Sequence, residues 1–143
     1  MQIDALRNLY PTGIKGFEGL IAKLLSELTG RKFILSKSGS QHGRDLSMRH
    51  FNCNIVAVEC KRYGSKTVLN ESELLGKIAQ ALKDIPDLDL WVLVTTKSMN
   101  SQLFEALEQQ CTLGGISFLS LSNDDEPSSL EILCAQAIKV VTE

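Results

Sequence analysis

The chain has 143 residues, 43% of them hydrophobic and 22% charged, and a formal net charge of −2. This length fits a single domain with a buried core, and the composition is that of an ordinary globular protein. Its slight acidity argues against a dedicated nucleic-acid binder, although local basic patches can still hold phosphates. The sequence has neither a run of eighteen apolar residues nor a basic-then-apolar N-terminal signal, so we expect a soluble, cytoplasmic protein with no membrane partner.

Two helices are predicted before the first strand. The first covers residues 2–9 and is broken by Pro11-Thr12-Gly13. The second covers residues 16–29, where apolar residues recur at the spacing of one helix face, and Gly30 ends it. Glu18 falls on the border of this apolar stripe, and the spacing leaves open whether it faces a functional site or solvent.

Three extended segments follow, at residues 32–37, 44–51 and 55–61. Small and polar residues mark residues 38–43 as a loop, which contains His42. The third segment is apolar on both faces, which is typical of a central strand covered on both sides.

The rest of the chain alternates helices and strands. We expect a helix over residues 71–84, a strand over 90–95, a helix capped by Ser98 or Asn100, a strand over 116–121 and a last helix opened by Pro127. An early β-meander followed by such alternation predicts an α/β fold, a sandwich around a mixed five-stranded sheet. We expect one domain over residues 1–143, which could be the N-terminal domain of a longer protein.

The four cysteines are Cys53, Cys60, Cys111 and Cys134. They show neither CxxC spacing nor the spacing of a zinc finger with the two histidines, so no zinc site is indicated. We expect reduced, mostly buried thiols, as in a cytoplasmic protein.

Charged residues end the third extended segment, which is otherwise apolar. Glu59 and Lys61 point to one face and Cys60 to the other, because side chains alternate along a strand. Burying such charges is costly unless they are paired or bind a metal. Asp45, fourteen residues earlier, can approach Glu59 if the two segments form a hairpin. Two carboxylates and a lysine then converge, which predicts a divalent-metal site.

The order Asp45…Glu59-Cys60-Lys61 resembles the D…(D/E)xK signature of the PD-(D/E)xK nuclease superfamily. Two further stretches are most similar to its Mrr-like branch of restriction endonucleases: Glu59-Cys60-Lys61-Arg62-Tyr63, and Thr95-Thr96 at a strand end. The resemblance spans roughly residues 16–121 and implies a restriction-endonuclease-like α/β/α sandwich. The loop before Asp45 departs from the family pattern, because Gln41 and His42 replace expected small residues.

The resemblance also implies which residues act. Asp45, Glu59 and the main-chain carbonyl of Cys60 would bind Mg²⁺, which Mn²⁺ could replace, and Glu18 matches the glutamate that the first helix often lends to the metal site. Lys61 would orient water or stabilise developing charge. Phosphate contacts are expected from Arg44, Arg62 and Lys66, and His42 is a further candidate that could instead face solvent.

We therefore expect a metal-dependent endonuclease that cuts double-stranded DNA in restriction or antiphage defence. The alternative is a catalytically silent module of the same fold that binds nucleic acid or protein, in which Glu59 and Lys61 form an ion pair and Asp45 is a turn residue. Nothing in the sequence reports on the 2′-hydroxyl, so RNA remains open as a substrate.

An acidic domain with few local cations should bind DNA weakly, so we expect activity to depend on clustering, through a fused sensor or oligomerisation module or as a homo-oligomer. Cleavage per active site, measured against protein concentration, should rise for the isolated domain and be higher for a fusion to an oligomeric partner. Flat and equal curves would show instead a self-sufficient nuclease.

Overall fold

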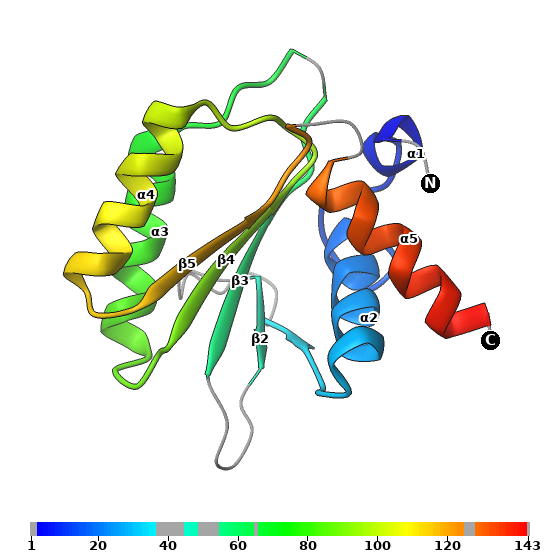
Figure 1. The fold of residues 1–143 in the computed structure, drawn as a ribbon, viewed down its shortest axis with the longest axis horizontal. Helices are drawn as coiled ribbons and strands as arrows, with labels where there is room; N and C mark the ends of the chain where they lie inside the picture. The colour runs from blue at the N-terminus through cyan, green and yellow to red at the C-terminus, as the bar shows by residue number, and fades with distance from the viewer. Residues whose placement is uncertain (1–2, 37–44, 49–54, 65, 125–127, 143) are drawn as a thin grey trace.

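The computed structural model describes residues 3–36, 45–48, 55–64, 66–124 and 128–142. Within these residues a mixed sheet lies between two layers of helices, as Figure 1 shows. One face is covered by α3 (Glu71–Asp84) and α4 (Ser101–Leu113), and the other by α2 (Phe17–Thr29) and α5 (Ser129–Thr142). The short helix α1 (Ile3–Arg7) lies at one end of the second layer (Figure 1). The predicted α/β/α sandwich is confirmed.

The sheet has five strands in sequence order. They are β1 (Ile34–Leu35), β2 (Leu46–Met48), β3 (Val56–Lys61), β4 (Leu90–Thr95) and β5 (Ser117–Leu121). The first three pair antiparallel, and β3, β4 and β5 pair parallel, because the connections through α3 and α4 return the chain in the same direction. The sheet is therefore mixed, as predicted. Strands β1 and β2 are shorter than expected, and residues 37–44 and 49–54 lie outside the described residues.

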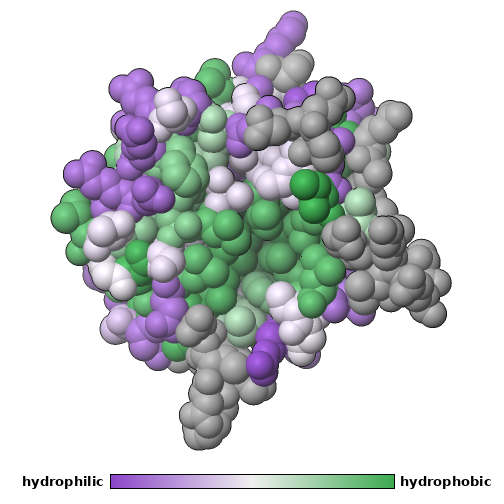
Figure 2. Space-filling model, viewed as in Figure 1, coloured by the Kyte–Doolittle hydropathy of each residue, from purple (hydrophilic) through white to green (hydrophobic). Residues whose placement is uncertain are grey.

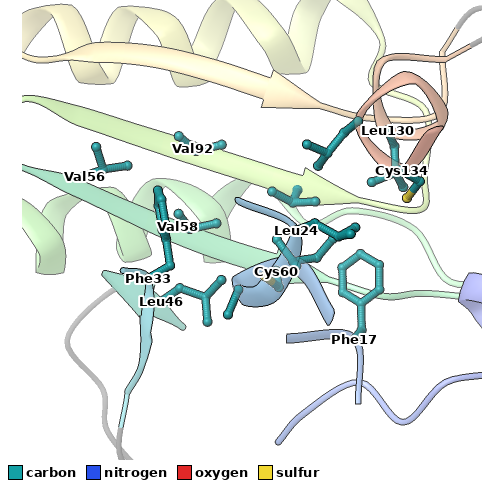
Figure 3. Close-up of a cluster of buried hydrophobic side chains, with 14 of the residues drawn as sticks. Phe17, Leu24, Phe33, Leu46, Val56, Val58, Cys60, Val92, Leu130 and Cys134 are labelled. Carbon is teal, nitrogen blue, oxygen red and sulfur yellow. The ribbon is translucent and has the colours of Figure 1, made fainter. Parts of the chain in front are cut away.

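The central strand β3 divides its side chains between two apolar clusters. Val56, Val58 and Cys60 pack with α2 and α5, whereas Ala57 packs with α3 and α4. Figure 3 shows the first of these clusters, in which side chains of β2, β3 and β4 meet those of α2 and α5. Because β3 is buried on both faces, a polar side chain at its end lies at the margin of the core.

The sequence indicated two of the helix caps, Asn100 and Gly30, whereas the cap Asn70 was not predicted. Asn70 and Asn100 are the N-caps of α3 and α4, and their side chains accept hydrogen bonds from the N–H groups of Glu73 and Leu103. Gly30 ends α2 at φ 69°, a left-handed conformation that suits glycine. Three of the cysteines, Cys60, Cys111 and Cys134, are buried free thiols as expected, and Cys53 lies outside the described residues.

The face of the molecule seen in Figure 2 has an apolar hollow in its middle, between the two helical layers. In the same view of Figure 1 the sheet is seen there edge-on, with β5 as its last strand. Leu119 of β5 and Ile132 of α5 keep 46% and 47% of their surface exposed. The segment Ser117–Leu121 carries no charged side chain, so it lacks the charges that commonly protect edge strands against pairing with other chains.

The segment before α2 lies close against the helix. The N–H groups of Gly16 and Gly19 donate to the carbonyl of Gly13, at 3.0 and 3.1 Å. A Cβ at position 19 would lie 1.9 Å from the main-chain oxygen of Ile14, so only glycine permits this approach. Glu18 lies in the first turn of α2 and accepts a hydrogen bond from the N–H of Gly13, so its side chain contacts this segment.

We predict that Gly19→Ala destabilises the protein by about 1–3 kcal/mol, because the added methyl displaces the backbone of Ile14. Gly76→Ala in α3 is the matched control, since nothing lies within 4 Å of its Cβ position. It should raise stability by about 0.5–1 kcal/mol, the ordinary gain from alanine inside a helix. Urea unfolding measures the free energy of unfolding of both variants. Equal values would show that the backbone of Ile14 does not lie tightly against Gly19.

Candidate active site

The hairpin of β2 and β3 brings Asp45 next to Glu59. The last pair of the ladder is Leu46 with Val58, and the N–H of Asp45 still donates to the carbonyl of Val58 at 2.8 Å. Beyond this point the N–H of Cys60 donates at 2.6 Å to the carboxylate of Asp45, which takes the place of a main-chain carbonyl. The predicted hairpin is present, and Asp45 lies close enough for its charge to act on Glu59. Asp45 and Glu59 both lie just beyond the last pair of the β2–β3 ladder.

Glu59 is buried, with 2% of its surface exposed. Its Oε1 lies 3.6 Å from the Nζ of Lys61, and its Oε2 has no hydrogen-bond partner among the described residues. Burial and the charge of Asp45 raise the pKa of Glu59 to about 8, against the attraction of Lys61 and Lys77. The side chain therefore has one buried oxygen available for a ligand.

Glu18 reaches the same place from α2. Its Oε1 accepts a hydrogen bond from the N–H of Gly13 at 3.0 Å. Burial, a hydrogen bond with Asp45 and the repulsion of that carboxylate raise the pKa of Glu18 to about 7. Of the two orientations that the spacing left open, the structure has the one toward Asp45.

Lys61 completes the cluster at the end of β3. Its side chain is 14% exposed, and its Nζ lies 2.5 Å from Oε1 of Glu73 in α3 and 5.9 Å from the ring centre of Tyr63. Burial lowers the pKa of Lys61, but the hydrogen bond to Glu73 and the charge of Glu59 outweigh it and raise this pKa. The amine is therefore held as an ammonium ion.

Two threonines at the end of β4 fix the backbone after Lys61. The hydroxyl of Thr95 donates to the carbonyl of Lys61 at 2.8 Å. The hydroxyl of Thr96 donates to the carbonyl of Tyr63 at 2.8 Å and accepts from its N–H at 2.9 Å. These bonds explain why threonines stand at this strand end, since their side chains bond main-chain groups at and just beyond the end of β3.

The residues predicted to contact phosphate are not gathered in one place by the described structure. Lys66 is exposed. Arg62 is half-buried and its Nη1 donates to the carbonyl of Arg7 at 2.9 Å, so it also ties the strand end to α1. Arg44 and His42 lie outside the described residues. Phosphate binding by these four residues stays a prediction.

Sequence reasoning missed two residues of α3, Glu73 and Lys77. Glu73 is the nearest partner of Lys61, and the charge of Lys77 acts on Glu59. Their spacing of four residues puts them on one helix face, with the glutamate first, and this was the available signal. It did not indicate that this face is turned toward the end of β3.

The donor atoms suit a hard divalent cation. Asp45, Glu59 and Glu18 offer carboxylate oxygens, which Mg²⁺ prefers, and the Oε2 of Glu59 is buried without a partner. Cys60 packs its side chain into the core, so it can offer only main-chain atoms here. In the described part of the chain, no three His, Cys, Asp or Glu side chains are already arranged around one point. The residues present thus have the chemistry of a divalent-metal site, although the described side chains do not surround one point.

A mixed sheet between helical layers, with Asp45 beside a Glu-x-Lys strand end, defines a restriction-endonuclease-like protein of the α/β class. The family model described as restriction endonuclease, Mrr_cat, matches residues 12–116. The chain therefore belongs to this restriction endonuclease family, as its motif predicted. No curated protein matches the chain.

We predict that the metal-free protein loses stability as the pH rises. The pKa of Glu59 is about 8 in the folded state and near the ordinary 4.5 when unfolded, so its contribution is full below pH 4.5 and is lost as the pH rises to about 8. The loss can reach a few kcal/mol. Unfolding in EDTA at pH 5 and pH 8 should show this for the wild type and less for Glu59→Gln, in which Glu18, with a pKa of about 7, still loses stability over this range. Glu27→Gln, on an exposed site of α2, is the control and should behave like the wild type; an equal pH dependence of all three proteins would contradict the assignment to Glu59.

Proposed function

We propose that this protein is a metal-dependent endonuclease that hydrolyses DNA phosphodiester bonds in restriction or antiphage defence. The observation that carries the proposal is the buried Glu59, whose Oε2 lacks a partner while Asp45 and Lys61 stand beside it. A buried carboxylate oxygen without a hydrogen-bond partner is costly, and a bound cation would compensate it. Membership of the restriction endonuclease family supports the same activity.

Asp45, Glu59 and the main-chain carbonyl of Cys60 would hold Mg²⁺ or Mn²⁺, with Glu18 beside Asp45 as a further oxygen donor. Such a cation, when bound, polarises the phosphate and lowers the pKa of a coordinated water. The carboxylates would then be ionised, because the cation replaces the neutralising proton of Glu59.

The remaining roles belong to cationic side chains. The ammonium of Lys61 would orient the attacking water or stabilise charge that develops on the phosphate. Arg44, Arg62, Lys66 and His42 are the proposed contacts to neighbouring phosphates, which position the nucleic acid without reading its sequence. Double-stranded DNA is the proposed substrate. Buried, free Cys60, Cys111 and Cys134 suit a protein kept in the reducing cytoplasm.

The competing function is a silent module of the same fold, in which Glu59 and Lys61 are only an ion pair. The distances argue against this account, because Lys61 lies 3.6 Å from Glu59 but 2.5 Å from Glu73. Lys61 therefore has a closer partner, and Glu59 keeps an unbonded oxygen. Among the described residues no helix is long and apolar enough to span a bilayer.

The direct test is incubation of the protein with duplex DNA, single-stranded DNA and RNA in Mg²⁺ or Mn²⁺. We expect cleavage of duplex DNA that disappears in excess EDTA, because the carboxylates alone cannot activate water. Cleavage that is equal with and without chelator would remove the metal assignment. Binding without cleavage under all metals would favour the silent module, and cleavage of RNA alone would correct the substrate.

Single substitutions locate the activity. Asp45→Ala, Glu59→Ala and Lys61→Ala should each lower the cleavage rate by about 10²–10³, the usual effect of removing one transition-state-stabilising group. Glu18→Gln should have a smaller effect. The control is the exposed Glu27→Gln on the same helix, and circular dichroism shows whether each variant is folded. A Lys61→Ala variant with the wild-type rate would place the chemistry elsewhere.

A further inference from the structure

Helix α3 begins at a fixed place relative to the end of β3. The side chain of its N-cap Asn70 accepts from the N–H of Glu73 at 2.9 Å, which sets the first turn. From this turn Glu73 reaches back across the connecting loop, and its Oε1 lies 2.5 Å from the Nζ of Lys61. The contact joins residues on two elements, so it depends on the cap as well as on the side chains.

This pair contributes little to stability by itself. The side chain of Glu73 is 42% exposed, and ion pairs open to solvent are typically worth less than about 1 kcal/mol. The pair matters more for the position of the Lys61 ammonium than for the stability of the fold. A lysine has a long flexible stem and turns its ammonium toward water when nothing holds it. Here the side chain of Lys61 is only 14% exposed, and its ammonium stays 3.6 Å from Glu59.

We propose that Glu73 is a positioning residue that holds the ammonium of Lys61 beside Glu59. The inference rests on the proposed nuclease function, in which Lys61 acts on the phosphate or its attacking water. In this role Glu73 would act through Lys61 and would itself touch neither substrate nor metal. It restricts Lys61 to the orientation that the reaction needs, much as outer residues orient the ligands of metal sites.

The simpler explanation of an acidic residue at this place is the helix dipole, which favours negative charge in the first turn. Glu71 provides the matched control, because it lies in the same first turn and is exposed. Glu71→Gln and Glu73→Gln each remove one negative charge from the first turn of α3. Only Glu73→Gln also removes the ion pair with Lys61.

The kinetic test compares these two variants on duplex DNA. Glu73→Gln should lower kcat about 10-fold to 100-fold, the usual cost of losing an outer partner, with KM little changed. Glu71→Gln should keep the wild-type rate. In a Lys61→Ala background Glu73→Gln should change the remaining rate by less than about twofold, because the group it positions is gone. Equal rates of the two glutamine variants, or an undiminished effect without Lys61, would overturn the proposal.

A second measurement does not need activity. Nitrogen-detected NMR of the lysine ammonium groups should show a slowly exchanging signal of Lys61, identified by its absence from Lys61→Arg. Glu71→Gln should keep this signal, and Glu73→Gln should lose it. If the wild type cleaves no nucleic acid, the proposed function fails and the NMR comparison still decides whether Glu73 holds Lys61. A signal that persists unchanged in Glu73→Gln would overturn the positioning role.

Discussion

A carboxylate buried at the end of the central strand is the constraint on which the rest of the site depends. Glu59 is 2% exposed and its Oε2 has no partner among the described residues. Burial and the charge of Asp45 raise the pKa of Glu59 to about 8, and the charges of Lys61 and Lys77 act in the opposite direction. In native proteins a buried charged group with an unbonded oxygen usually belongs to a functional site, and its cost is offset by stabilising contacts in the rest of the fold.

Apolar packing on both faces of β3 stabilises the strand that carries Glu59. Its other side chains lie in two apolar clusters, so the strand is anchored by α2 and α5 on one side and by α3 and α4 on the other. Threonines at the end of β4 hold the backbone that follows Lys61. The polar groups of the site therefore project from a rigid strand end, which is the kind of support that a precise arrangement needs.

The groups around Glu59 arrive from different elements and have different constraints. Asp45 is fixed by a hydrogen bond from the N–H of Cys60, at the point where the ladder of β2 and β3 ends. Glu18 accepts a hydrogen bond from the N–H of Gly13, in the segment before α2. Lys61 depends on where α3 begins. All of these residues lie within residues 12–116, the part of the chain that the family model matches.

The sequence by itself predicted the order of the elements, the mixed sheet and, provided that the two segments form a hairpin, the approach of Asp45 to Glu59. Alternation along a strand and the 3.6-residue period of a helix report how a side chain is directed on its own element, and this is why the shared face of Glu59 and Lys61 was predictable. Periodicity does not report how far that element lies from another. Only the tertiary structure could decide that Glu18 turns toward Asp45, that Glu73 meets Lys61 across 12 residues, and that Arg62 contacts Arg7 across 55. Those contacts depend on the packing of helices against the sheet, which is set by the whole core.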